Sequence, residues 1–305
     1  MYNSSDLISI AMASYNGEKY IAEQLDSIIN QTHKHIEIVI ADDHSSDQTV
    51  NIINDFIKRY SFIKLYENGV NLGITKTFEN ALLYCNGKYI AISDQDDVWV
   101  KDKLEVLAAA INSEDAAYAN SLFVDESCKS LGVDFKSTMN LKSYYSGAPF
   151  LLGNCLPGHS ILMKYDFVQT LFPFPEGIMF DRWISFKASS NNGIKYVDRL
   201  LVNYRQHQNN AVGIKKNQHS SKQKILLVSK FNTKLNELSI YAHTSFKDEK
   251  SREILNTMLQ LFNRCWSLKR SLFFFKNFNT ILTLKKRTSF RKFLFCIKMF
   301  FKANY

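Results

Sequence analysis

Short apolar runs alternate with helical patterns through the first hundred residues of the chain. Residues 7–13, 36–41 and 88–92 are apolar and β-prone, as expected of buried strands. Residues 20–30 and 46–60 lie between them and carry apolar side chains at helical spacing. This alternation predicts a parallel sheet covered by helices on both faces.

Each apolar run ends in a polar cluster. The clusters occupy residues 14–17, 42–49 and 93–97. In open parallel sheets, ligands bind in the crevice outside the carboxyl ends of the strands. We therefore expect all three clusters to lie at one ligand-binding edge of the sheet.

The third cluster is strongly acidic, because Asp94, Asp96 and Asp97 fall within four residues. Three neighbouring carboxylates repel one another unless a cation lies among them. Hard divalent cations prefer oxygen ligands, and Mg²⁺ often bridges carboxylates to substrate phosphates. The pattern predicts a metal and diphosphate site. The alternative is a solvated acidic turn before the helix expected near residues 101–104.

Six motifs follow one another along the chain. They are Ala13-Ser14-Tyr15-Asn16-Gly17, Ala41-Asp42-Asp43, Asn71-Leu72-Gly73, Asp94-Gln95-Asp96-Asp97, Phe180-Asp181-Arg182-Trp183 and Tyr204-Arg205-Gln206-His207-Gln208-Asn209-Asn210. In order and spacing they resemble the family 2 glycosyltransferases with the GT-A fold. The last two are most similar to a bacterial rhamnosyltransferase branch that decorates surface polysaccharides. The resemblance covers residues 7–213. It implies an α/β fold with a mixed, mainly parallel nucleotide-binding sheet and flanking helices.

The resemblance implies a nucleotide-binding set and a metal-binding set. The nucleotide-binding set is Ala13, Tyr15, Asp43, Asn71, Lys76, Asp94 and Gln95. The metal set, for Mn²⁺ or Mg²⁺, is Asp94, Asp96, Asp97 and His207. Hydrogen-bond chemistry fits one of these roles, since a carboxylate such as Asp43 accepts well from the N3–H of uracil or thymine. Alternatives remain for three residues: a packing aromatic for Tyr15, a simple turn at Asn71, and a solvated polar loop at His207.

The resemblance also places a general base at Asp181. A carboxylate can take the proton from an acceptor hydroxyl as that hydroxyl attacks the sugar. The alternative is a first-turn residue that favours the start of the next helix. Contacts to the diphosphate or the acceptor are expected from Arg182, Trp183, Arg205, His159 and Trp99.

Charge divides the chain into two regions, which we expect to be a catalytic domain (1–214) and a helical appendage (215–305). The first holds 18 Lys and Arg against 25 Asp and Glu, and the second holds 20 against 4. Phe290, Phe293 and their neighbours recur at helical spacing in the basic region, which suits an anionic membrane surface. The alternative is a helical bundle that packs on the catalytic domain or on another subunit. No nucleic-acid partner is expected, because the tail lacks a recognised nucleic-acid fold and the catalytic region is acidic.

We therefore expect an inverting glycosyltransferase that uses a nucleoside diphosphate sugar, best matched by dTDP-L-rhamnose. The acceptor would be a lipid-linked or surface glycan. The alternatives are a UDP-hexose donor (galactose, glucose or N-acetylhexosamine), or a catalytically degenerate interaction protein. A dinucleotide-binding enzyme or a nucleotidyltransferase is disfavoured, because residues 14–19 carry no glycine-rich loop. Five cysteines without a CxxC pair, and the lack of a signal peptide or spanning segment, predict a cytoplasmic protein on the inner face of the cell membrane.

Overall fold

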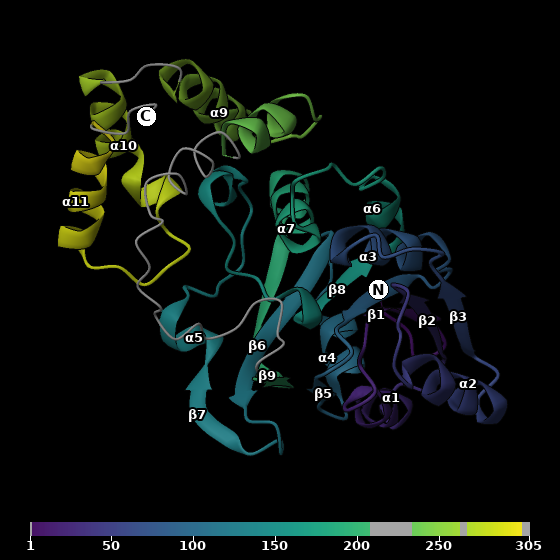
Figure 1. The fold of residues 1–305 in the computed structure, drawn as a ribbon. Helices are drawn as coiled ribbons and strands as arrows, with labels where there is room; N and C mark the ends of the chain where they lie inside the picture. The colour runs from purple at the N-terminus through teal and green to yellow at the C-terminus, as the bar shows by residue number, and fades with distance from the viewer. Residues whose placement is uncertain (1, 208–233, 263–266, 301–305) are drawn as a thin grey trace.

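A nine-stranded sheet organises the protein. The computed structural model describes residues 2–207, 234–262 and 267–300 (Figure 1). The main path of the sheet runs β3-β2-β1-β4-β8-β6-β9-β5, and β7 pairs with β6 beside it. The strands are β1 (Ile8–Ser14), β2 (Ile36–Asp42), β3 (Ile63–Glu67), β4 (Tyr89–Ser93), β5 (Val98–Trp99), β6 (Ala116–Val124), β7 (Ser130–Asp134), β8 (Ile161–Lys164) and β9 (Ile194–Arg205).

The sheet is parallel in its first half and mixed in its second. Strands β1, β2, β3 and β4 pair in parallel, whereas β8 is antiparallel to both β4 and β6. The long β9 pairs in parallel with β6 and antiparallel with β5. The predicted mixed, mainly parallel sheet is confirmed.

Side chains on each strand alternate between two hydrophobic layers. Ile8, Ile10 and Met12 of β1 join one layer, and Ala11 joins the other, as the period of two in a strand requires. The first layer is covered by α1 (Ile21–Ile29), α2 (Thr49–Arg59) and α4 (Lys103–Ala110). The second is covered by α3 (Ile74–Leu83), α7 (Phe180–Ser190) and the C-terminal helices. The short helices are α5 (Phe135–Thr138), η1 (Ala148–Leu152), η2 (Gly158–Ser160) and α6 (Tyr165–Gln169).

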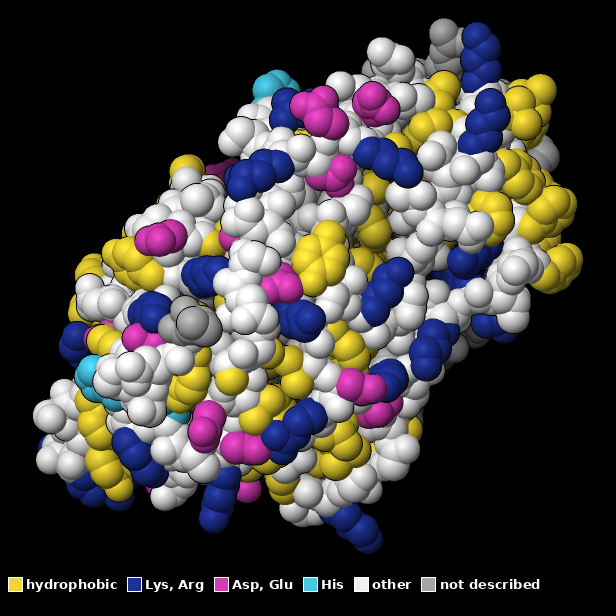
Figure 2. Space-filling model, turned by 180° about the vertical axis from the view of Figure 1, so that it is seen from behind, with side chains coloured by type: hydrophobic (Ala, Val, Ile, Leu, Met, Phe, Trp, Pro, Cys, Tyr) yellow, Lys and Arg dark blue, Asp and Glu magenta, His cyan; other side chains and the backbone are white. Residues whose placement is uncertain are grey.

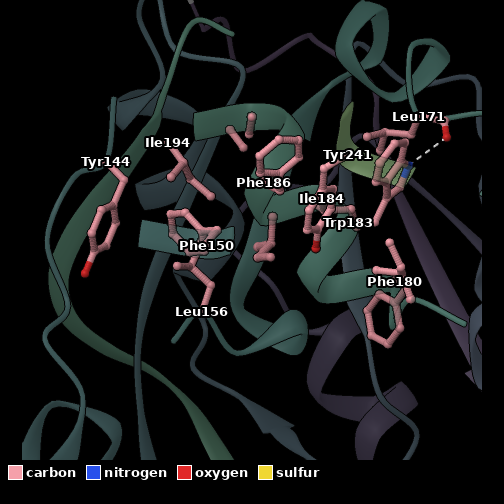
Figure 3. Packing of buried hydrophobic residues seen from close by; sticks show 14 of the residues in the cluster. Tyr144, Phe150, Leu156, Leu171, Phe180, Trp183, Ile184, Phe186, Ile194 and Tyr241 are labelled. Carbon is pink, nitrogen blue, oxygen red and sulfur yellow. Dashed lines mark hydrogen bonds between the residues drawn. The ribbon is translucent and has the colours of Figure 1, made fainter. Parts of the chain in front are cut away.

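The C-terminal helices share the second hydrophobic layer with α3 and α7. Residues 234–242 are helical, and α9 (Glu249–Phe262), α10 (Leu268–Ile281) and α11 (Ser289–Lys298) follow. Tyr241 stacks on Phe186 of α7 with ring centroids 4.0 Å apart, and both belong to the packed group in Figure 3. The boundary expected at residue 214 falls outside the described residues, so it stays a prediction.

The tail has a buried part and an exposed part. Phe262 and Phe274 are buried in the shared layer, as a packed bundle requires. Phe290 and Phe293 of α11 are 68% and 48% exposed. Two further aromatic residues of the basic region, Trp266 and Phe301, lie outside the described residues. Among the described helices, none is both long enough and apolar enough to cross a bilayer.

Candidate active site

The polar clusters after β1, β2 and β4 lie at one edge of the sheet, as expected, and their loops are tied to one another. The backbone N–H of Tyr15 donates to Oε1 of Gln95 at 2.9 Å, and Nε2 of Gln95 donates back to the Tyr15 carbonyl at 2.9 Å. This pair joins the loop after β1 to the loop after β4. A Cβ on Gly17 would lie 2.1 Å from Oε1 of Gln95, so the pair requires glycine there. The Tyr15 side chain itself is 49% exposed and free to stack on a planar ligand.

Asp43 holds the loop that contains the Asn71 motif. Its carboxylate accepts from the backbone N–H groups of Leu72 (2.7 Å) and Gly73 (2.9 Å), and from Nδ2 of Asn68 (2.9 Å). Nδ2 of Asn71 donates to the Asp43 carbonyl at 3.2 Å. An ionised carboxylate offers about four acceptor positions, so Asp43 keeps capacity for one more donor.

Two other members of the predicted nucleotide set differ in their surroundings. Ala13, at the end of β1, is half-buried and packs against the second hydrophobic layer. Lys76, in the first turn of α3, forms an ion pair with Glu79 at 2.8 Å, and its side chain is 52% exposed. The Glu79 side chain is buried, whereas the Lys76 side chain can be reached from solvent.

Asp94 and Asp97 meet a histidine from a distant part of the chain. Nδ1 of His159, in η2, lies 3.6 Å from Oδ2 of Asp94 and 3.5 Å from Oδ2 of Asp97. One possible ligand atom from each of these three residues lies within 4.8 Å of the other two. The opposite ring nitrogen, Nε2, is 2.9 Å from Oγ of Ser121 on β6. Burial lowers the pKa of the His159 imidazole and favours the neutral form, which is the form that binds metals.

Asp97 is the buried centre of this cluster. Burial raises the pKa of its carboxyl well above the usual range, and the negative charges of Asp96 and Asp94 raise it further. Among the described residues, Oδ2 of Asp97 has no hydrogen-bond partner. A cation beside that oxygen would favour the ionised carboxylate and give it a partner. The donor set of two carboxylates and one imidazole therefore fits a divalent metal.

A buried lysine supports the turn that carries His159. Nζ of Lys103 donates to the His159 carbonyl at 2.7 Å and lies 3.2 Å from the ring centroid of Trp99. Burial lowers the pKa of the Lys103 ammonium, while the charges of Asp97 and Asp94 favour its protonated form. Lys103 thus places a buried amino group behind the acidic cluster.

Asp96 pairs with His207 instead of joining the cluster. Nε2 of His207 is 2.8 Å from Oδ2 of Asp96, and the imidazole stacks on Tyr20 with centroids 4.9 Å apart. The predicted metal set therefore divides into Asp94 and Asp97 on one side and Asp96 with His207 on the other. Residues 208–210 of the same motif lie outside the described residues.

Arg205 has a structural role that differs from the expected phosphate contact. It is buried at the end of β9. Its guanidinium donates to the Asp96 carbonyl (2.9 Å), the Glu126 carbonyl (2.5 Å) and the Glu23 carboxylate (2.5 Å). Its backbone N–H donates to Asp97 at 3.1 Å. These contacts fix the acidic loop, and they occupy the side chain that a phosphate would need.

The expected base, Asp181, lies in the first turn of α7 beside the turn that carries His159. A Cβ on Gly158 would lie 3.3 Å from Cβ of Asp181. The Asp181 carboxylate accepts from Nδ2 of Asn154 (2.9 Å) and from the backbone N–H of Arg182 (2.7 Å). Burial raises the pKa of Asp181 to about 6, against the lowering effect of these two hydrogen bonds. A carboxylate with such a pKa suits proton transfer near neutral pH.

Three expected ligand contacts are corrected by the structure. Trp99 is buried in the first hydrophobic layer. Trp183 is buried in the second, where its indole N–H donates to the Leu171 carbonyl at 2.9 Å (Figure 3). Arg182 forms a two-point ion pair with Glu237 at 2.6 and 2.9 Å. Packing and ion pairing therefore account for all three side chains.

Sequence reasoning missed two residues near the site, Lys103 and Asn154. His159 was expected as a diphosphate or acceptor contact, and the structure places it beside Asp94 and Asp97. Lys103 had a local signal, because it falls one residue before the apolar positions of α4 that face the core. Asn154 had none, because it lies in an irregular segment between η1 and η2.

The chain belongs to glycosyl transferase family 2. Residues 9–182 match the family described as Glycosyl transferase family 2. A relative from Shigella flexneri, "dTDP-rhamnosyl transferase RfbG", is 33% identical over 66% of this chain and 73% of its own length. A relative from Escherichia coli, "UDP-Glc:alpha-D-GlcNAc-diphosphoundecaprenol beta-1,3-glucosyltransferase WfaP", is 30% identical over 66% of this chain and 78% of its own length. The predicted enzyme class is confirmed.

The fold has solved counterparts. The structure of Staphylococcus aureus TarS residues 1–349 in complex with UDP-GlcNAc aligns with a TM-score of 0.60 and 18% identity. The alignment covers 97% of this chain and 80% of that one. This likeness shows the GT-A fold, and the alignment also extends over the described C-terminal helices.

Proposed function

We propose that this glycosyltransferase is metal-dependent and inverting, and that Asp181 is its catalytic base. The observation that carries the proposal is the placement of Asp181. Its half-buried carboxylate, with a pKa of about 6, lies beside Gly158 in η2. The next residue, His159, faces Asp94 and Asp97. A base for the acceptor and a cation site for the diphosphate thus share one edge of the sheet.

The reaction would be a single displacement at the anomeric carbon. The acceptor oxygen forms the new bond to that carbon as its proton passes to the Asp181 carboxylate. The bond between the carbon and the diphosphate oxygen breaks, and the nucleoside diphosphate leaves with the electron pair. Asn154 orients the Asp181 carboxylate through its 2.9 Å hydrogen bond.

A divalent metal would be held by Asp94, Asp97 and His159, with Asp96 and His207 beside it. When bound, such a metal stabilises negative charge on a departing diphosphate. Ser121 fixes the His159 ring through Nε2, as an outer partner of a metal-binding imidazole does. Asp43 would accept the N3–H of the pyrimidine, and Tyr15 would cover the face of the base.

The donor we favour is dTDP-L-rhamnose. The Shigella flexneri relative, which is described as a dTDP-rhamnosyl transferase, supports this choice, as does the sequence of residues 204–210. A UDP-hexose is the second candidate, because the Escherichia coli relative is described as a UDP-Glc transferase and TarS binds UDP-GlcNAc. Uracil and thymine present the same N3–H to Asp43, so that contact does not separate the two donors.

The acceptor we favour is a hydroxyl of a lipid-linked glycan, reached at the inner face of the cell membrane. The Escherichia coli relative is described as acting on a diphosphoundecaprenol-linked sugar. The basic C-terminal helices would keep the cytoplasmic protein on that surface.

Thermal unfolding with a panel of nucleotide sugars, with and without Mn²⁺, tests the proposal. Ligand binding to the native state raises its stability by mass action. We expect a metal-dependent rise in Tm that is larger with dTDP and dTDP-rhamnose than with UDP sugars. A larger rise with a UDP-hexose would keep the enzyme class and change the donor.

The Asp181→Asn variant tests the base. It should show the same nucleotide-dependent rise in Tm as the wild type, because it removes a base and not a donor ligand. Transfer should fall by roughly 10²- to 10⁴-fold, the usual contribution of a general base. Transfer within tenfold of the wild-type rate would rule out Asp181 in this role.

A further inference from the structure

Helices α10 and α11 present an apolar surface away from the active site. Figure 1 shows them beside one another at the end of the molecule opposite β2 and β3. On α11, the side chains of Phe290, Phe293, Leu294 and Ile297 are between 37% and 68% exposed. Their spacing places them along one face of the helix. Such a row of large apolar side chains is unusual on a surface that faces only water.

The apolar surface continues onto α10. Leu268 and Leu272 are 63% and 50% exposed, and they lie one turn apart. The rings of Phe275 and Phe293 are in contact with centroids 5.2 Å apart, so the two helix faces meet. In Figure 2, hydrophobic side chains gather at the upper right edge of the molecule, where these helices lie.

A hollow opens between the two helices. It has a volume of about 520 Å³ and is lined by Phe275, Phe278, Ser289, Phe290 and Phe293. Four of these five side chains are aromatic, and the fifth is small. The hollow therefore suits an apolar chain and offers little to a polar ligand.

Lys and Arg residues are frequent in and between these two helices, and the same stretch of sequence contains no Asp or Glu. Lys269, Lys276, Lys285, Lys286, Arg287, Arg291, Lys292 and Lys298 lie on or between the two helices. The sequence has no Asp or Glu after Glu253. Lys and Arg side chains border the apolar edge in Figure 2. A partner of this surface must therefore be both negatively charged and apolar.

We propose that the α10–α11 surface docks on an anionic lipid bilayer, with Phe290 and Phe293 inserted among the acyl chains. The Lys and Arg side chains would then contact the anionic headgroups, and the aromatic side chains would be buried away from water. A second copy of this chain would bring two cationic surfaces together, which like-charge repulsion opposes. The inference rests on the proposed function in one respect: docking would bring the enzyme to a lipid-linked acceptor.

Sedimentation of the full chain with vesicles tests the proposal. Vesicles of phosphatidylglycerol and phosphatidylcholine should bind the protein at low salt. Vesicles of phosphatidylcholine alone should bind at least tenfold less, and high salt should weaken binding to the anionic vesicles. Phe290→Ser/Phe293→Ser should reduce binding to anionic vesicles at least tenfold. The matched control is Leu131→Ser/Val133→Ser, because these side chains on β7 are 43% and 37% exposed.

The charge contribution has its own pair of variants. Lys286→Gln/Arg291→Gln should weaken binding to anionic vesicles. Lys34→Gln/Lys101→Gln, which removes the same charge from exposed positions elsewhere, should not. Equal binding by wild type and both surface variants, or no binding by the wild type, would overturn the proposal. A dimer in light scattering that dissociates in Phe290→Ser/Phe293→Ser would also overturn it, in favour of a second copy.

The rise in Tm with added nucleotide, measured on the same samples, tests the proposed function independently of vesicle binding. All surface variants should keep the wild-type response to the donor. Vesicle binding without any nucleotide response would refute the donor assignment and leave the docking surface standing.

Discussion

Nδ1 of His159 lies 3.5 Å from Oδ2 of Asp97, which is buried and has no hydrogen-bond partner among the described residues. The pair joins the loop after β4 to η2. Three features behind the pair support it: Lys103 holds the His159 carbonyl, Ser121 holds Nε2, and Arg205 holds the Asp97 loop. This arrangement presents two carboxylates and an imidazole from fixed positions, which a metal site requires.

His159→Ala should weaken the dependence of nucleotide binding on metal. Removal of one ligand should raise the Mn²⁺ concentration for half-maximal stabilisation by dTDP or UDP roughly tenfold or more. The measurement is a Mn²⁺ titration of Tm at saturating nucleotide. The control is His35→Ala, because His35 is exposed and its Nδ1 contacts the carbonyl of Ser5 at 2.8 Å, away from the acidic cluster. An unchanged Mn²⁺ midpoint would show that the metal does not bind His159.

Sugar transfer should depend on pH through Asp181. The ionised carboxylate is the base, so kcat/KM should rise with pH and level off above the pKa of about 6. Asn154→Ala removes a hydrogen bond that lowers this pKa, so the rise should move to higher pH. The measurement is the pH profile of kcat/KM for both proteins. A midpoint that is the same in both would contradict the role given to Asn154.

Asp181→Asn should be more stable than the wild type at neutral pH. Because the pKa of Asp181 is higher in the native protein than in the unfolded chain, the native state binds more protons between about pH 4 and 6. Its stability therefore falls as the pH rises through that range, by up to about 3 kcal/mol. The asparagine side chain does not ionise, so the variant does not lose stability in this way as the pH rises. Urea unfolding at pH 4 and pH 8 should show the advantage of the variant growing with pH, and a constant difference would refute it.

Lys103→Met should destabilise the protein by about 1–3 kcal/mol, because the His159 carbonyl loses its buried donor. It also removes the amino group whose protonated form the Asp97 charge favours. Asp97→Asn should consequently cost less in the Lys103→Met background than in the wild type. A double-mutant cycle by urea unfolding measures this coupling. The control is Lys101→Met at an exposed position, and strict additivity of the two substitutions would exclude the coupling.

Much of the fold could be predicted from local pattern. The period of apolar residues defined β1, β2 and β4, and the helices between them, because burial on a sheet face or a helix face imposes that period. The polar clusters at the strand ends then had to share one edge, since parallel strands end on the same side. The spacing of Phe290, Phe293 and Ile297 likewise predicted α11, and the structure confirms that helix.

The roles of individual side chains depended on contacts that the sequence does not display. Arg205 and Trp183 were expected at the ligand and are buried in structural contacts instead. Their partners, such as Glu23 and Leu171, come from other elements, and no local period predicts which elements will meet.

The sequence by itself determined the strand and helix alternation, the acidic edge with Asp94, Asp96 and Asp97, and the basic tail. Each of these features depends on residues that are close together in the chain. Only the tertiary structure decided that His159 faces Asp97, that Lys103 lies beneath them, and that Phe274 is buried while Phe290 is exposed. The physical reason is that burial and ion pairing belong to surfaces brought together by packing, and packing joins residues that are far apart in the chain.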